Sequence, residues 1–240
     1  MNRFLLIGLK NLFRLPGVYS RLCRYAQNPE KYPEAERWAY TKSVLELAIR
    51  SGNIDLQVTG VENIPTEPGF MMYGNHQGLF DVLAIGATCP MPLGIVYKKE
   101  LKDVPVLKQI LTFTKSFAMD REDVRQSLTV IQNVTKEVEA GRNYVIFPEG
   151  TRSKQGNTMG DFHGGSFRCA VKAKCPVVPM ALIDCFQVLD QKGSKKVSAQ
   201  LHYLPAIPYE EYEGMKAAEL AELVKSRIQA CIEEHTAVSS

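Results

Sequence analysis

From Ile54 onward, short apolar runs alternate with longer stretches whose apolar residues recur every three or four positions. The short runs predict buried strands, and the longer stretches predict helices that pack on them. Strands are expected at residues 54–58, 70–74, 93–97, 116–119, 143–147, 176–183 and 197–204, and helices at 79–88, 101–111, 122–140, 165–174 and 215–234. This alternation predicts the α/β class, with a mixed, largely parallel central sheet flanked by helices.

Proline positions and period-two alternation indicate which strands lie at the edges of the sheet. Apolar and polar residues alternate over 54–58, which predicts an outer strand with one solvated face. Pro205 and Pro208 follow the strand predicted at 197–204, and proline is disfavoured in the middle of a sheet. We therefore expect both strands at sheet edges.

The first 53 residues show a different pattern, with helices predicted at 1–29 and 35–50 and a break or kink at Pro16-Gly17. On a helical wheel, the basic residues of the first helix gather on one face and apolar residues occupy the other. The basic set is Arg3, Lys10, Arg14, Arg21 and Arg24, and the apolar set is Leu5, Leu9, Leu12, Tyr19 and Leu22. Such a cationic amphipathic arm suits the interface of an anionic membrane.

Two regions are therefore predicted. Residues 1–53 form an N-terminal amphipathic two-helix membrane-anchoring region, and residues 54–240 form an α/β domain. The alternative is that the arm packs on the protein's own core and keeps its basic face in water. Residues 1–29 contain no acidic side chain, which favours membrane binding. No apolar stretch approaches the roughly 18 residues of a spanning helix, so we expect a peripheral or monotopic protein at the cytoplasmic face of the cell membrane.

Composition excludes several other classes. A net charge of +3 is too small to indicate a nucleic-acid partner, and most of it comes from the N-terminal arm. The six cysteines form no Cys-x-x-Cys pair, so a zinc site is not expected and the thiols are interpreted as reduced and packed in the core. Lys10 ends the first apolar run after six residues, which is too short for a secretory signal.

The first candidate for chemistry is a histidine and an aspartate five positions apart, His76 and Asp81. Helix and strand geometry would both keep these side chains apart, so the chain must turn between them. Gly78 permits a turn, and residues 79–85 predict a helix whose first turn holds Asp81. A carboxylate-held imidazole has a fixed tautomer and can act as a general base toward a hydroxyl group. Alone, such a pair is more often a surface ion pair or a helix cap.

A second polar stretch, residues 148–153, follows the apolar run 144–147 in the same way that His76 follows the strand at 70–74. Ligands of α/β sheets bind outside the carboxyl ends of the strands, so these two stretches are expected in one crevice. Lys98, Arg121 and Arg152 also follow strands and would bring positive charge to that edge. Three cations around one base indicate an anionic substrate such as a phosphate monoester. The alternative for each cation is a surface salt bridge with a nearby carboxylate.

These residues fall in four blocks: Asn75-His76-x-x-x-x-Asp81, Asp120-Arg121, Phe147-Pro148-Glu149-Gly150-Thr151-Arg152 and Val177-Val178-Pro179. In this order the blocks resemble the glycerolipid acyltransferases, and most closely the 1-acyl-sn-glycerol-3-phosphate acyltransferases. The resemblance runs from about Gly60 to about Ile183.

The resemblance implies that His76 takes the proton from the sn-2 hydroxyl of lysophosphatidic acid and that Asp81 orients it. The acyl group would come from an acyl thioester of acyl-carrier protein or coenzyme A, and the product would be phosphatidic acid for phospholipid biosynthesis. No other cofactor and no metal is implied. The substrate-binding residues implied by the resemblance are Lys98, Arg121, Glu149, Gly150, Thr151 and Arg152. The sequence departs from the family at His163, where many relatives carry lysine.

Three alternatives remain at this stage. The acceptor could be glycerol-3-phosphate or another lysophospholipid, because the motifs do not separate these. A non-catalytic protein that binds anionic lipid would need only the basic arm, but such a protein needs no general base. A thioester hydrolase would use water as the acceptor, and the cluster of cations argues against it.

Overall fold

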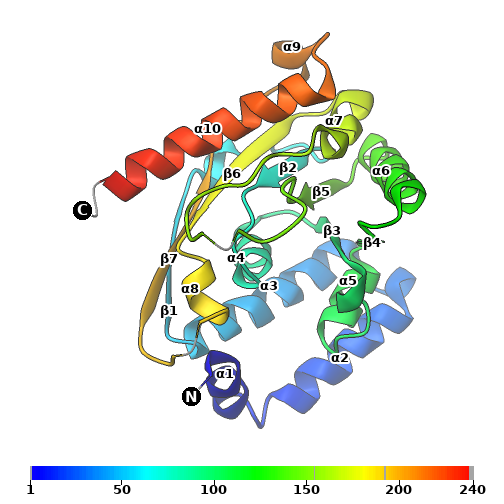
Figure 1. Ribbon diagram of the computed structural model, residues 1–240. Coiled ribbons are helices and arrows are strands. Elements are labelled where there is room, and N and C mark those ends of the chain that lie inside the picture. Colours follow the sequence, from blue (N-terminus) through cyan, green and yellow to red (C-terminus); the bar gives the residue numbers. More distant parts are fainter. Residues whose placement is uncertain (1, 154, 192, 238–240) are drawn as a thin grey trace.

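A seven-stranded sheet in the order β1-β7-β6-β2-β5-β3-β4 forms the centre of the computed structural model, which describes residues 2–153, 155–191 and 193–237 (Figure 1). The strands are β1 (Ile54–Thr59), β2 (Met71–Gly74), β3 (Leu93–Lys98), β4 (Phe117–Met119), β5 (Asn143–Ile146), β6 (Val177–Ile183) and β7 (Val197–Tyr203). Every neighbouring pair is parallel except β6 and β7. The predicted class, a mixed and largely parallel sheet, is confirmed.

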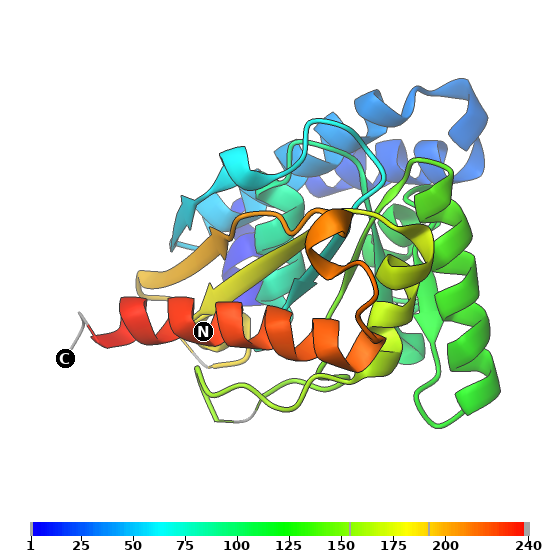
Figure 2. The same ribbon diagram turned by 90° about the horizontal axis from the view of Figure 1, so that it is seen from above.

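Helices cover both faces of this sheet (Figures 1 and 2). They are α1 (Arg3–Lys10), α2 (Leu15–Gln27), α3 (Glu34–Ser51), α4 (Phe80–Thr88), α5 (Leu107–Phe113), α6 (Val124–Glu139), α7 (Arg168–Ala173), α8 (Phe186–Leu189), α9 (Tyr209–Tyr212) and α10 (Ala217–Ala237). Successive residues of β2 point to opposite faces, as strand geometry requires. Met71 and Tyr73 join a core with α6, α7 and α10, whereas Met72 joins a core with α3 and α4.

The position of β7 corrects one prediction. β7 lies between β1 and β6 and is not at an edge, whereas β1 is an edge strand as expected. The two prolines do not interrupt the sheet because the strand already ends at Tyr203. Beyond it, Ile207 forms a single antiparallel bridge with Val177. A proline after a strand therefore marks where pairing stops and does not place the strand at an edge.

The helix predicted at 101–111 is shorter than expected. Residues Lys99–Leu101 form a 3₁₀ turn, and α5 begins only at Leu107. Pro105 explains the difference, because proline lacks an amide donor and disfavours helical backbone at the residue before it. The chain then passes through Val106, whose φ of 72° is unusual for a β-branched residue.

The N-terminal arm departs from the predicted helical wheel in three ways. The break falls between Lys10 and Leu15, so Pro16 stands in the first turn of α2, where proline is tolerated. Arg3 is buried, and its guanidinium donates to the carbonyl oxygens of Val188, Gly52 and Lys195. Leu22 is also buried, packing beside Phe113 of α5. These two residues hold the arm on the domain and do not belong to a face that contacts lipid.

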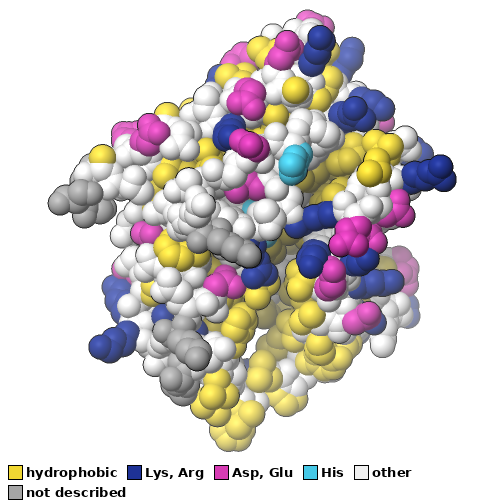
Figure 3. Space-filling model, in the orientation of Figure 1, with side chains coloured by type: hydrophobic (Ala, Val, Ile, Leu, Met, Phe, Trp, Pro, Cys, Tyr) yellow, Lys and Arg dark blue, Asp and Glu magenta, His cyan; other side chains and the backbone are white. Residues whose placement is uncertain are grey.

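The other apolar residues of the arm stay in solvent. Phe13 is 97% exposed, and several neighbours are about half exposed. The exposed set is Phe4, Leu5, Leu9, Leu12, Phe13, Leu15 and Tyr19. In Figure 3 apolar side chains gather along the lower edge of the molecule, where α1 and α2 lie. Among the described residues, no helix has both the length and the apolar character needed to cross a bilayer. The membrane-anchoring role of residues 1–53 stays a prediction.

Candidate active site

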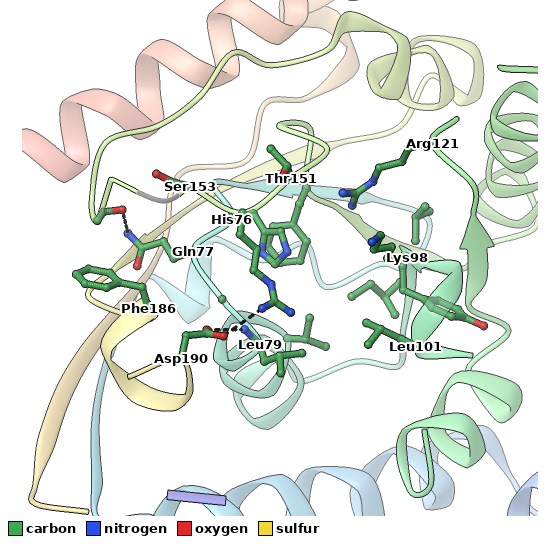
Figure 4. Close-up of a pocket in the computed structure, with 18 of the residues that line it drawn as sticks. His76, Gln77, Leu79, Lys98, Leu101, Arg121, Thr151, Ser153, Phe186 and Asp190 are labelled. Atoms are coloured by element: carbon green, nitrogen blue, oxygen red, sulfur yellow. Dashed lines mark hydrogen bonds and ion pairs between the residues drawn. The ribbon is translucent and has the colours of Figure 1, made fainter. Parts of the chain in front are cut away.

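His76 and Asp81 meet where β2 gives way to α4. His76 lies in the loop after β2, and Asp81 lies in the first turn of α4. The distance from His76 Nδ1 to Asp81 Oδ2 is 2.7 Å. Because a carboxylate can only accept, Nδ1 is the donor, which leaves Nε2 with a free lone pair. The imidazole lines a cavity of about 690 Å³ (Figure 4). The Asp81 side chain behind it is fully buried.

The loop wraps its own backbone around the Asp81 carboxylate. Oδ2 also accepts hydrogen bonds from the amides of Gln77, at 2.7 Å, and Gly78, at 2.9 Å. Asp81 therefore fixes both the imidazole and the turn that presents it.

Gly78 is required for a different reason from the one the sequence suggested. Its φ is not in the left-handed region, so the turn itself does not demand glycine. Instead, a Cβ at this position would lie 2.1 Å from Asp190 Oδ2. That oxygen is also 3.3 Å from the amide of Leu79, and Oδ1 is 3.1 Å from Arg152 Nη1. Gly78 thus allows the Asp190 carboxylate to approach the histidine loop closely and to hold Arg152.

The segment that follows β5 contacts both the ring and the backbone of His76. The Phe147 ring stacks on the imidazole, with centroids 4.3 Å apart and planes inclined by 21°. Glu149 accepts from the amide of His76 through Oε1 and from the amide of Gly160 through Oε2, both at 2.8 Å. Burial raises the pKa of the Glu149 carboxyl group. The structure therefore gives Glu149 a part in fixing the backbone of His76, and its contact with a substrate stays a prediction.

Gly150 has the left-handed backbone that its position requires. Its φ is 68°, and a Cβ there would lie 3.3 Å from the ring of His163. Thr151 follows and lines the cavity beside His76. His163, the position that departs from the family, faces the neighbouring groove and not the His76 cavity.

The three predicted cations reach the cavity from three different segments. Lys98 ends β3, Arg121 follows β4 and Arg152 follows Thr151, and all three line the cavity around His76. Figure 4 shows Lys98 and Arg121 on one side of the imidazole. Lys98 Nζ lies 3.2 Å from Glu100 Oε1, and its side chain is 58% exposed. The pairs Lys98–Glu100 and Arg152–Asp190 are exposed enough to contribute little stability, so an anionic ligand can replace the carboxylates.

A second, mostly apolar groove of about 480 Å³ adjoins the first cavity. The two share Phe147, Thr151 and Arg121 in their walls. The far side of the groove is formed by α6, where Val124 is 71% exposed. Polar chemistry and apolar surface therefore meet at the carboxyl ends of β2, β3 and β5.

Several contacts that support the site were not expected from the sequence. Gln77 donates to Asn157 Oδ1 at 2.8 Å and accepts from the amide of Cys185 at 2.8 Å. Asn75 exchanges two hydrogen bonds of 2.8 Å with the backbone of Leu182 in β6. Asp190 lies beyond the span of the resemblance, which ends near residue 183. The sequence signal for these contacts was the polar Asn75 and Gln77 on either side of His76.

The sequence model described as Acyltransferase matches residues 55–183, more than half of the chain. The chain belongs to this family. Two similar proteins are both named 1-acyl-sn-glycerol-3-phosphate acyltransferase. The one from Saccharomyces cerevisiae is 27% identical over 75% of this chain and 61% of its own length. The one from Helicobacter pylori is 33% identical over 52% of this chain and 53% of its own length. The chain thus spans between half and two thirds of these two relatives.

The fold of this family member also matches a solved structure. The crystal structure of the 1-acyl-sn-glycerophosphate acyltransferase PlsC from Thermotoga maritima aligns with a TM-score of 0.77. The alignment covers 97% of this chain and 96% of that chain at 20% identity. The likeness therefore includes the N-terminal helices as well as the sheet.

Proposed function

We propose that this protein transfers an acyl chain from an acyl thioester to the sn-2 hydroxyl of a 1-acyl-sn-glycerol-3-phosphate, forming phosphatidic acid. The observation that carries the proposal is the Asp81-held imidazole of His76 in a cavity that Lys98, Arg121 and Arg152 also line. The names of the similar proteins support the same reaction.

His76 acts as a general base in this reaction. Its Nε2 accepts the proton of the acceptor hydroxyl while the hydroxyl oxygen attacks the thioester carbonyl carbon. Asp81 stabilises the imidazolium that forms. When the tetrahedral intermediate collapses, the carbon–sulfur bond breaks and the thiolate takes the proton from His76. A thiol has a pKa of about 8.5, so this leaving group needs less help from an acid than an amine would.

The cations select the phosphate end of the acceptor. An arginine grips a phosphate through two parallel hydrogen bonds, and a lysine adds a point charge. Lys98 and Arg152 would bind the phosphate, with Arg121 nearby. Glu100 and Asp190 currently pair with the first two cations, and the phosphate would replace these carboxylates as their partner.

The apolar surfaces suit the acyl chains and the membrane. Figure 3 shows the hollow of the site continuing between apolar walls toward the lower edge, where the exposed apolar residues of α1 and α2 lie. Lys10, Arg14, Arg21 and Arg24 are exposed on the same N-terminal arm and would attract anionic lipid. The protein would thus sit as a peripheral or monotopic protein on the cytoplasmic face of the cell membrane. The donor would be an acyl thioester of acyl-carrier protein or coenzyme A.

The test is an assay of the purified protein and of His76→Ala with lysophosphatidic acid, glycerol-3-phosphate and an uncharged lysolipid as acceptors. We expect transfer to lysophosphatidic acid in the wild type and a loss of at least about 1000-fold in the variant, because the base is gone. Equal use of the uncharged lysolipid would contradict the role of the cations. Substantial transfer by a folded His76→Ala protein would contradict the mechanism.

A further inference from the structure

Three metal-binding side chains meet on the sheet face that α10 covers, apart from the cavity that His76 lines. Cys231 and His235 are four residues apart on α10, which places them on one face of the helix. His202 comes from β7 beneath them. One ligand atom from each of the three lies within 4.8 Å of the other two. A modest change of side-chain torsions brings such atoms to the spacing of a shared metal ion.

Both imidazoles are already anchored through Nδ1. His202 Nδ1 is 2.7 Å from the Thr59 hydroxyl, and His235 Nδ1 is 2.9 Å from the carbonyl oxygen of Cys231. When Nδ1–H donates to such an oxygen, Nε2 keeps its lone pair, which is how metal-binding histidines are usually oriented. His202 Nε2 lies 3.0 Å from Gln200 Oε1, which can only accept, so Nε2 carries the proton here and Nδ1 accepts from the Thr59 hydroxyl. A metal ion at Nε2 would displace the Gln200 amide, and Nδ1–H would then donate to the Thr59 hydroxyl oxygen.

The surroundings of the cluster suit a bound ion. The rings of His202 and His235 lie with centroids 4.0 Å apart. His202 and Cys231 are 4% and 7% exposed, whereas His235 is half-buried and gives access from solvent. A thiolate with two imidazoles is a donor set that zinc favours, and three protein ligands leave the fourth position for water.

We propose that His202, Cys231 and His235 form a zinc site that fixes the last turns of α10 to β7. Binding would replace the proton of the Cys231 thiol by the metal ion and release that proton to solvent. None of the three residues lines the cavity around His76, so the role is structural and independent of acyl transfer. This proposal revises the expectation from the sequence, which considered Cys-x-x-Cys pairs and overlooked the Cys231-x-x-x-His235 spacing.

The experiment uses the whole chain, stripped of metal by a chelator and titrated with Co²⁺ and then Zn²⁺. We expect one equivalent of Co²⁺ to give a thiolate-to-cobalt charge-transfer band that Zn²⁺ abolishes, and Zn²⁺ to raise the melting temperature. Cys231→Ser should lose the band, and His235→Ala should weaken Zn²⁺ binding by about tenfold or more, in competition with a chromophoric chelator. Cys23→Ser, at a half-exposed cysteine on α2, is the matched control and should bind as the wild type does.

Absence of the band in the wild type would overturn the proposal. So would a folded Cys231→Ser protein that keeps the wild-type affinity for Zn²⁺, because the ion would then be bound elsewhere on the surface. If Cys231→Ser does not fold, His235→Ala decides the question, since its side chain is half-buried near the end of the helix. Unchanged affinity in that variant would equally reject the site.

Discussion

At the scale of single residues, Asp81 performs two tasks with one oxygen. Its Oδ2 holds the imidazole and accepts two backbone amides. In Asp81→Asn, the amide can offer a donor to the imidazole and shift its proton to Nε2, the wrong tautomer for a base. We expect kcat to fall by about 1000-fold or more, with little change in the KM for the acceptor. Steady-state kinetics measure both values.

The matched control for this variant is Asp55→Asn. Asp55 lies on the edge strand β1, and its exposed carboxylate pairs with Lys196. It should keep wild-type kinetics. If Asp81→Asn retained more than a tenth of the wild-type kcat, the tautomer argument would fail.

Gly78 and Asp190 should behave as a coupled pair. In Gly78→Ala the new Cβ would meet Asp190 Oδ2 at 2.1 Å, so the carboxylate and the Arg152 it holds must shift. We expect kcat/KM to fall by about tenfold, equivalent to about 1.4 kcal/mol. In an Asp190→Ala background the same change should cost less than about twofold, because contacting residues are not additive.

A double-mutant cycle on kcat/KM measures this coupling. Additive effects would mean that Gly78 serves the backbone turn itself and not the approach of Asp190. Gly165→Ala is a suitable control, because a Cβ at that glycine meets nothing within 4 Å.

At the scale of secondary-structure elements, Arg3 ties α1 to three separate parts of the domain. Its guanidinium donates to backbone carbonyls of Val188, Gly52 and Lys195. Arg3→Ala would leave buried carbonyls without donors. We therefore expect the free energy of unfolding to fall by about 2 kcal/mol. Thermal or denaturant unfolding checks this value. Arg14→Ala, an exposed arginine of the same arm, should leave stability unchanged, and equal losses in both variants would refute the anchoring role of Arg3.

Local patterns in the sequence predicted the strands well because buried parallel strands are short, apolar and bounded by polar turns. Local patterns could not place β7 within the sheet. The antiparallel pairing of β6 with β7 depends on the path of the chain that connects the two strands, and not on the sequence of either strand. These patterns also misplaced Arg3, because a helical wheel shows which residues share a face but not what that face packs against. The onset of α5 was readable from Pro105 and was missed.

At the scale of the whole molecule, contacts between residues close in sequence were predictable in the site, and contacts between distant residues were not. His76 and Asp81 are close in sequence, so their contact was predictable from the need for a turn. Asp190 and Asn157 reach the site from distant parts of the chain. Asp190 accepts hydrogen bonds from the Leu79 amide and from Arg152, and Asn157 accepts one from Gln77. Their spacing in sequence carries no signal of that contact. The Cys231–His235 spacing was visible, but only the sheet shows that His202 lies beneath it.

The last prediction concerns the edge formed by the arm. Leu9, Leu12 and Phe13 are at least half exposed, although a large exposed apolar group is unfavourable in water. A triple change of these residues to serine removes no buried contact, so the fold should persist. Each apolar side chain that enters lipid contributes about 1.5–3 kcal/mol, so binding to anionic vesicles should fall by about 100-fold or more.

Vesicle sedimentation measures this loss, and transfer to lysophosphatidic acid dispersed in detergent should remain near the wild-type rate. Val61→Ser is the control, because Val61 is 38% exposed, lies in the turn after β1 and not on the arm, and lines neither the cavity nor the groove. If the triple variant bound vesicles as well as the wild type did, the apolar edge would not be the membrane contact. Loss of transfer in detergent as well would mean that the arm shapes the site and does not simply bring it to the lipid surface.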